Sequence, residues 1–400
     1  MASERVKGNG GNGELADLAV IGAGPAGCAL ALEVARSGFE VVLCEQHRIR
    51  RDKLCGEFLS PEALAHLRNF GLDRALAPTF DSPSIDHVRV TVPGQRDLVH
   101  PLSPPARGLS RLHLDGALAA ACSQAGVRVL DRWRATRIRD AGEESFVVEG
   151  VDGDGARLEL RARIAAAAFG REERLGEAER SERVREDERR RSSRFIAWKG
   201  HHRGEGPGSG VELHIFRGGY CGVASIEGDR TNVCGLATRE AFRSAGSSVE
   251  ALVGEASGQN PALARRLAGL DPLSPIPLTA ASMSFQRRRP IDGRLLCLGD
   301  AAAMIAPLCG DGIGMALSSA VLARDWVKHR LAGDVTPDAM LSGYARSWRR
   351  AFLRQLEVGE ALQRLLLAPR TAAWTVRMCR ALPALTGWLV RHTRDAALVS

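Results

Sequence analysis

The chain has 400 residues, of which 44% are hydrophobic and 26% are charged, and its formal net charge is +8. This composition is typical of a soluble globular protein with one large or two ordinary domains, and it excludes a disordered chain, a collagen-like fibre and a multi-pass membrane protein. A basic protein could bind nucleic acid, but only 5% of the residues are aromatic and no basic stretch alternates with stacking rings. We therefore expect no nucleic-acid partner.

The chain begins with residues 1–14, which are rich in glycine and polar side chains and are expected to form a disordered arm. The nine cysteines are scattered along the chain and form no C-x-x-C pair. This pattern is typical of reduced thiols in a cytoplasmic protein, and it indicates neither a disulfide framework nor a metal site.

The next segment combines a strand, a glycine-rich turn and a helix. Asp17–Ile21 is an apolar run typical of a buried strand, Gly22-Ala-Gly-Pro-Ala-Gly27 supplies the turn, and Cys28–Arg36 favours a helix. A second strand is predicted over Phe39–Glu45. In this order the G-x-G-x-x-G pattern indicates a dinucleotide-binding βαβ unit.

The glycines of this turn have different physical roles. Gly22 allows the tight turn, Gly24 lets a pyrophosphate approach the backbone, and Gly27 lets the helix pack closely on the strand. The N-terminus of the helix then faces the anion. Glu45 ends the second strand, where a carboxylate can bond to ribose hydroxyls, and Gln46 follows it. Such a unit binds FAD or NAD equally well, so this segment leaves the cofactor open.

A second glycine cluster lies in the last third of the chain. Leu295–Asp300 is predicted to be a strand that ends in an acid, and Pro307 to Gly314 form a glycine-rich loop that opens a helix. A strand-end carboxylate can hold sugar-like hydroxyls, and the free N–H groups of a helix N-terminus suit an electron-rich ring edge. The arrangement looks like a flavin-contacting G-D motif with its P-x-x-G-x-G partner.

Together the two clusters resemble the aromatic-hydroxylase-type (p-hydroxybenzoate hydroxylase-like) FAD flavoproteins, in particular the branch that contains the geranylgeranyl reductases. Arg111, ahead of a predicted helix, matches the arginine that in this superfamily usually reaches the FAD phosphate or ribityl region. The resemblance covers residues 15–330 and implies FAD as the cofactor, with Asp300 on its ribityl hydroxyls. The residues that it assigns to FAD are Gly22, Gly24, Pro25, Ala26, Gly27, Glu45, Gln46, Arg111, Gly299, Asp300, Pro307, Gly310, Gly312, Ile313 and Gly314.

Two further residues are candidates for catalysis. The segment Lys53–Pro61 is similar to one that runs alongside the isoalloxazine ring in geranylgeranyl reductase-like members, which places Cys55 near the flavin. An inert buried thiol is the alternative for Cys55. Tyr220, which follows a flexible Arg-Gly-Gly approach, is interpreted as a pocket residue, with plain sheet packing as the alternative. The sequence contains no evident acid–base pair.

One segment departs from the superfamily. Hydroxylases usually carry A-D-G-x-x-S in the middle of the chain, but residues 164–173 keep only Gly170, without the Asp before it or the Ser after it. This weakens the case for direct binding of NAD(P)H, which remains the expected electron donor, with a separate electron source as the alternative. Flavin halogenases carry W-x-W-x-I-P, which is absent here, so halogenation is not expected.

The expected fold class is α/β, with a Rossmann-like FAD-binding domain interleaved with a β-sheet substrate domain and followed by C-terminal helices. His201 and His202 are expected to be exposed loop residues rather than a metal site. The FAD-binding domain is predicted over 15–80, 108–170 and 290–335, the β-rich substrate domain over 81–107 and 195–289, a charged insertion over 171–194, and the helical region over 336–400.

The helical region contains a basic amphipathic segment, predicted as one helix over Thr371–Thr393. It combines Trp374 and Trp388 with several arginines, a pattern that suits either a membrane surface or a cover for the cavity. Most such helices pack on their own domain. We therefore predict a cytoplasmic protein, with plain packing of this segment as the first interpretation and peripheral membrane contact as the alternative. The sequence does not indicate an oligomeric state.

Three hypotheses for function follow from the resemblance. The first is an FAD-dependent monooxygenase that hydroxylates a lipophilic aromatic or polyketide-like molecule through a flavin C4a-hydroperoxide. The second is a geranylgeranyl reductase-like enzyme that reduces carbon–carbon double bonds. The third, favoured by the incomplete 164–173 segment, is a flavin-binding protein without catalytic activity.

Overall fold

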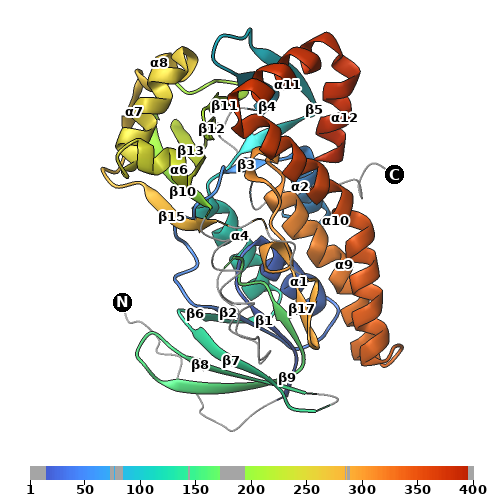
Figure 1. Ribbon diagram of the computed structural model, residues 1–400. Coiled ribbons are helices and arrows are strands. Elements are labelled where there is room, and N and C mark those ends of the chain that lie inside the picture. The colour runs from blue at the N-terminus through green and yellow to red at the C-terminus, as the bar shows by residue number, and fades with distance from the viewer. Residues whose placement is uncertain are drawn as a thin grey trace.

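The computed structural model describes residues 15–72, 76, 84–142, 145–171, 194–283, 285 and 289–394. The arm predicted over 1–14 and residues 172–193 of the predicted charged insertion lie outside these ranges. The described residues form two sheets with helices around them, one sheet in the lower half of Figure 1 and the other in the upper half. This arrangement is the α/β architecture predicted from the sequence.

The first sheet has eight strands, in the order β16-β17-β9-β1-β2-β6, with β8 on β9 and β7 on β8. Its central strands are parallel and largely buried, which is why their sequences read as continuous apolar runs. The strands are β1 (Leu15–Ile21), β2 (Val41–Glu45), β6 (Arg128–Asp131), β7 (Arg134–Asp140), β8 (Phe146–Val151), β9 (Arg157–Ala167), β16 (Ile291–Asp292) and β17 (Leu295–Cys297).

Helices α1 (Pro25–Ala35), α4 (Arg111–Gln124) and α9 (Gly312–Ala332) share the apolar core of this sheet. α1 is buried over most of its length, because it lies between the sheet and both other helices. The predicted order of strand, glycine turn, helix and strand is therefore confirmed, with the second strand beginning at Val41 instead of Phe39. α2 (Pro61–Asn69) packs against α9.

The second sheet has nine strands, in the order β14-β10-β13-β12-β11-β4-β5-β3, with β15 on β10. Most of its strands lie within 81–107 and 195–289, the ranges described as β-rich from the sequence. The strands are β3 (Phe58–Leu59), β4 (Ser84–Thr91), β5 (Leu98–Gly108), β10 (Phe195–Gly204), β11 (Gly210–Phe216), β12 (Gly219–Ile226), β13 (Arg230–Thr238), β14 (Leu270–Pro272) and β15 (Leu278–Met283).

Helices α6 (Arg239–Ser244), α7 (Val249–Gln259) and α8 (Pro261–Leu267) lie beside one face of this sheet (Figure 1). Leu252 of α7 and Leu263 of α8 share a hydrophobic cluster with Trp198 on β10. The sequence analysis described this region only as β-rich and missed these helices, although each begins at a capping residue: Thr238, Ser248 and Asn260.

The C-terminal region is helical, as predicted, and consists of α10 (Pro337–Leu367), α11 (Pro369–Ala381) and α12 (Pro383–His392). α10 packs against α9 and buries Trp348 and Phe352 in the core of the first sheet. The prediction of one helix over Thr371–Thr393 was wrong. The segment forms two helices that meet at Leu382, because Pro383 has no backbone N–H to continue α11.

Candidate active site

A cavity of ≈ 330 Å³ lies where the two sheets meet, and both glycine clusters line it. Gly24 and Pro25 line it from the start of α1, and Gly310 and Gly312 from the start of α9. Gly299 lies between the clusters, since a side chain there would place its Cβ 3.2 Å from the Cβ of Ala26. Two loops that are far apart in the sequence therefore open onto one continuous space.

The three glycines of the first loop are held in different environments. Gly22 has a positive φ of 112°, and a Cβ there would lie 2.4 Å from the carbonyl oxygen of Ala168. A Cβ on Gly27 would lie 1.9 Å from the carbonyl oxygen of Gly22. A Cβ on Gly24, by contrast, would meet only the Nη2 of Arg111, at 3.7 Å. Gly22 and Gly27 are therefore required by the fold, whereas Gly24 leaves backbone open to the cavity.

Arg111 lines the cavity beside Gly24 and is held by Asp115, one helical turn further along α4. Its Nε and Nη2 donate to the two carboxylate oxygens of Asp115, each at 2.9 Å. Lys53 Nζ lies 2.8 Å from the same carboxylate. Burial lowers the pKa of the Arg111 guanidinium, but the Asp115 carboxylate raises it more, so the arginine stays charged. The sequence analysis missed Asp115, although its i,i+4 spacing from Arg111 was a usable signal.

Glu45 and Gln46 lie behind the first loop rather than on the cavity wall. Glu45 is buried at the end of β2 and accepts the N–H groups of Ala23 and His47, both at 3.1 Å. It is therefore hydrogen-bonded to the glycine turn itself. Gln46 lines a separate surface pocket with Arg48 and Arg132. The ribose role assigned to this pair stays a prediction.

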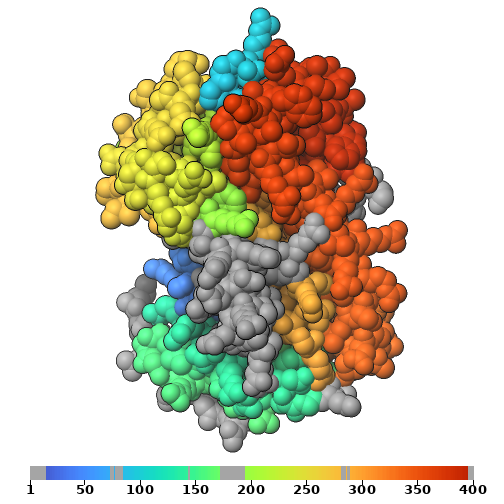
Figure 2. Space-filling model, in the orientation of Figure 1, coloured from blue at the N-terminus to red at the C-terminus, as the bar shows by residue number. Residues whose placement is uncertain are grey.

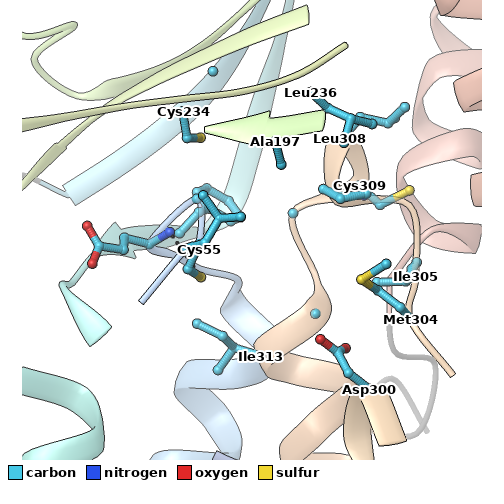
Figure 3. Close-up of a pocket in the computed structure, with 18 of the residues that line it drawn as sticks. Cys55, Ala197, Cys234, Leu236, Asp300, Met304, Ile305, Leu308, Cys309 and Ile313 are labelled. Atoms are coloured by element: carbon cyan, nitrogen blue, oxygen red, sulfur yellow. Dashed lines mark hydrogen bonds between the residues drawn. The ribbon is translucent and has the colours of Figure 1, made fainter. Parts of the chain in front are cut away.

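The second cluster is tied to three other elements. Gly299 donates its N–H to Ser319 Oγ at 3.0 Å, and Asp300 lines the cavity (Figure 3). Asp311 is buried and accepts hydrogen bonds from Ser60 Oγ at 2.7 Å and Gln355 Nε2 at 2.8 Å. These bonds connect the start of α9 to Ser60, which lies between β3 and α2, and to α10. The sequence analysis missed Ser60 and Gln355, because both are far from Asp311 in the chain.

Three other predicted residues of this cluster have clear places. Pro307 and Ile313 line the cavity, as predicted for contact residues. Gly314 does not line it, since a Cβ there would lie 2.2 Å from Asp311 Oδ1. Gly314 therefore serves the packing of the loop.

The rest of the cavity wall is mostly apolar. In Figure 3, Ala197 and Leu236 of the second sheet lie above the cavity, and Met304 and Leu308 lie on the loop before α9. All nine cysteines are free, and the three half-buried ones, Cys55, Cys234 and Cys309, are the ones that line this cavity. Burial raises the pKa of Cys234 to about 12, so that this thiol is protonated at neutral pH. The cavity therefore suits a lipophilic molecule.

Tyr220 is a polar side chain on this mostly apolar wall. It is 4% exposed, and its hydroxyl has no hydrogen-bond partner of good geometry among the described residues. Burial raises the pKa of Tyr220 well above its ordinary value, and the nearby Leu308 backbone offsets only part of that rise. Tyr220 and Cys55 both line the cavity, and their catalytic roles stay predictions.

The prediction that His201 and His202 are exposed loop residues was wrong. Both lie on β10 and are half-buried. His201 Nε2 lies 2.6 Å from a carboxylate oxygen of Glu57, and Lys199 Nζ lies 2.5 Å from the other. Glu57 lines the cavity but was not predicted. No local sequence signal points to this cluster, because Glu57 and His201 are 144 residues apart.

The residues of this cavity fit a flavin dinucleotide. The open backbone at Gly24 and the charged Arg111 suit a pyrophosphate, and the N-termini of α1 and α9 both add partial positive charge. Asp300 is a carboxylate beside these donors, where hydroxyls of a ribityl chain would need an acceptor. The remaining lining of the cavity is mostly apolar.

Comparison with known proteins agrees with this fit. A family model described as "FAD binding domain" matches residues 16–190. Menaquinone reductase of Mycobacterium tuberculosis is 32% identical over 159 residues, which are 38% of this chain and 37% of that enzyme. The chain therefore matches little more than a third of that relative's length. Digeranylgeranylglycerophospholipid reductase 2 of Methanopyrus kandleri is 25% identical over 84% of this chain and 83% of that enzyme.

Solved structures share the whole fold. The flavin-dependent brominase Bmp2 superposes with a TM-score of 0.76 at 17% identity, over 95% of this chain and 93% of that one. PqsL of Pseudomonas aeruginosa, a probable FAD-dependent monooxygenase, superposes with a TM-score of 0.69 at 20% identity, over 91% of this chain and 99% of that one. At these identities the likeness concerns the fold alone. None of the helices in the described ranges is long and apolar enough to span a bilayer.

Proposed function

We propose that the chain is an FAD-dependent oxidoreductase of the aromatic-hydroxylase-type superfamily and that it reduces a carbon–carbon double bond of a lipophilic molecule. The observation that carries this proposal is the shared cavity, which joins two cofactor loops to an apolar pocket. The relative that aligns over 84% of the chain is named as a reductase of a prenylated lipid. This reverses the order of the two enzyme hypotheses drawn from the sequence.

Different residues around the cavity would hold different parts of FAD. FAD, when bound, supplies the ring that accepts and donates a hydride. Arg111 and the N-terminus of α1 would hold its pyrophosphate, and Asp300 its hydroxyls. The N-terminus of α9 would face the ring edge that gains negative charge on reduction.

Reduction of a double bond also consumes a proton, and the apolar wall offers two weak acids. The Cys55 thiol and the Tyr220 hydroxyl both line the cavity. Tyr220 is protonated at neutral pH, because burial raises its pKa. We assign the proton to Tyr220 Oη, because it is a hydroxyl on the mostly apolar part of the cavity wall.

Anaerobic turnover tests the proposal. Enzyme reduced with dithionite under nitrogen should convert a prenylated quinone or lipid to a product two mass units heavier. Hydroxylation is the second candidate, and it is the one that needs no acid on the cavity wall. A product that forms only with O₂ and gains one oxygen atom would establish hydroxylation and contradict the reductase. NAD(P)H is the proposed electron donor, tested by bleaching of the flavin absorbance on its addition.

The C-terminal helices support a membrane surface as partner. Residues 369–392 contain four arginines and no acidic residue. Ala372 and Val376 of α11 pack in the hydrophobic cluster that includes Tyr220 and Leu236, whereas Trp374 is 57% exposed. Figure 2 shows the C-terminal helices as part of the outer surface. We propose that α11 and α12 contact anionic lipid, since tryptophan and arginine both favour that interface.

A further inference from the structure

A buried ionic cluster joins the two halves of the molecule beside the cavity. Lys199 on β10 has a side chain that is only 1% exposed, and its Nζ lies 2.5 Å from Oε1 of Glu57, which is fully buried. The same Nζ donates to the carbonyl oxygen of Lys53 at 3.1 Å. His201, on the same face of β10, bonds to the other carboxylate oxygen of Glu57. Burying such charges is costly unless they are paired, so this contact is a specific feature of the fold.

Glu57 connects this cluster to the start of α4. Its carboxylate accepts the backbone N–H of Arg111 at 2.8 Å, and its carbonyl accepts the N–H of Leu109 at 2.9 Å. Its φ is +55°, a conformation that costs about 1 kcal/mol or more for a residue other than glycine. These bonds hold the strained residue in place and fix Arg111 relative to β10.

The Cys55 loop is held from the second sheet as well. Asn232 on β13 donates from Nδ2 to the carbonyl oxygens of Cys55 at 3.2 Å and Gly56 at 2.8 Å. Cys55 Sγ in turn accepts the N–H of Glu57 at 3.4 Å. The loop between Lys53 and Glu57 is thus bonded to two adjacent strands, while Cys55 faces the cavity (Figure 3).

We propose that Glu57, Lys199 and His201 are positioning residues that fix Cys55 and Arg111 relative to each other on the cavity wall. Arg111 and Cys55 line the same cavity and their side chains interact directly, so the cluster holds two adjacent groups of one site in place. The proposal rests on the proposed function for the role of that site. The geometry of the Cys55 loop does not depend on the proposed function.

Glu227 provides a matched control. It is also buried and also caps the start of α4, since it accepts the N–H of Ser110 at 2.9 Å. Its charged partners are His113 and Arg230, which belong to α4 and β13. A change at Glu227 therefore removes a similar buried carboxylate that bonds to the start of α4. It leaves the bonds from Glu57 to Lys199 and His201 intact.

The experiment compares Glu57→Gln, Lys199→Met and Glu227→Gln. It measures the melting temperature, the Kd for FAD and the rate at which iodoacetamide alkylates Cys55, followed by mass spectrometry. We expect all three to lower the melting temperature. Glu57→Gln and Lys199→Met should also raise the alkylation rate of Cys55 and the Kd for FAD at least about tenfold, while Glu227→Gln changes both less than about threefold. Equal effects in all three variants would reduce the cluster to a stabilising contact and overturn the proposal.

A double variant separates positioning from stability. Glu57→Gln with Lys199→Met removes both buried charges, and such replacement often restores stability. The proposal expects the melting temperature to recover while Cys55 stays reactive. Recovery of both the melting temperature and the low reactivity of Cys55 would contradict the proposal. If the unaltered protein binds no FAD, the proposed function fails, but alkylation of Cys55 in the apoprotein still tests the positioning. Asp52, Glu57 and His201 place ligand atoms within 4.8 Å of one another, so stoichiometric Zn²⁺ binding that is lost in His201→Ala would instead establish a metal site.

Discussion

Gly24 and Gly27 belong to one turn, but a side chain would meet different surroundings at each. At Gly27 a Cβ would clash with the backbone of Gly22, whereas at Gly24 it would make only an ordinary contact with Arg111. Gly312 is open too, with no atom of the described chain within 4 Å of an added Cβ. Neither open glycine has a positive φ. The protein's own packing therefore does not require glycine at these two positions, whereas a ligand that approached the backbone there would.

The open glycines give a sharp prediction. Gly24→Ala and Gly312→Ala should leave the melting temperature within about 3 °C, since both alanines fit the apoprotein. The Kd for FAD should rise at least about tenfold in each, because the added methyl occupies space at the ligand. Gly27→Ala should instead lose several kcal/mol of unfolding free energy and therefore melt at a lower temperature. Calorimetry and FAD titration check both, and unchanged FAD binding in the two open-site variants would contradict the site.

Tyr220 gives a second prediction at the residue scale. Removing its unpartnered hydroxyl in Tyr220→Phe should leave the stability unchanged or raise it by up to about 1 kcal/mol. The turnover number should fall at least about tenfold while flavin content is unchanged. The control is Tyr344→Phe, whose buried hydroxyl donates to the Cys297 carbonyl at 2.8 Å and should cost about 1 kcal/mol. A stability loss in Tyr220→Phe would show that its hydroxyl does have a partner.

The elements of the fold divide into those with local sequence signals and those without. β1, α1, β2 and the start of α9 were predictable, because each depends on apolar runs and glycines that are adjacent in the chain. The caps of α6–α8 were local signals too, but they were read as part of a β-rich region. The partners of Glu57 and Asp311 were not predictable, because Lys199, His201 and Gln355 reach them only through the packing of separate elements.

The contact between α8 and β11 predicts a specific pH dependence. Arg266 on α8 donates from Nε and Nη2 to both carboxylate oxygens of Glu212, which also bonds to His214. Burial raises the pKa of Glu212, but these bonds lower it to about 2, from an ordinary value of 4.5. The stabilisation is therefore complete above about pH 4.5 and is lost as the pH falls toward 2.

Denaturant unfolding of Glu212→Gln checks this dependence. The variant should lose about 2 kcal/mol at pH 7, and the difference from the unaltered chain should shrink as the pH falls below 4.5. Asp97→Asn is the control, because its pair with Arg89 is solvent-exposed and should contribute little. A difference that is constant from pH 7 to pH 3 would show that the ion pair is not its cause.

At the scale of the whole molecule, the cavity lies where three layers meet. The first sheet supplies the cofactor loops, the second sheet supplies much of the apolar wall, and α11 packs behind that wall through Ala372 and Val376. The outward face of α11 carries Trp374 and arginines. A lipophilic substrate would thus be taken up next to the surface that we propose to contact lipid.

Vesicle binding tests this orientation. The protein should sediment with vesicles that contain an anionic phospholipid and much less with purely zwitterionic ones. The double variant Arg377→Glu with Arg380→Glu should lose most of this binding. Arg349→Glu with Arg350→Glu, the same charge change on exposed positions of α10, should keep it. Equal loss in both variants would mean that net charge, and not the face of α11 and α12, governs the interaction.

The central claim is that one FAD molecule extends between the loops at Gly24 and Gly312. Calorimetric titration of the apoprotein with FAD, FMN and ADP tests it most directly, because the two smaller nucleotides each carry one end of FAD. If both loops hold a single dinucleotide, FAD should bind at one per chain and at least about 100-fold more tightly than either FMN or ADP. FAD that binds no more tightly than FMN, or that fails to bind, would contradict the account.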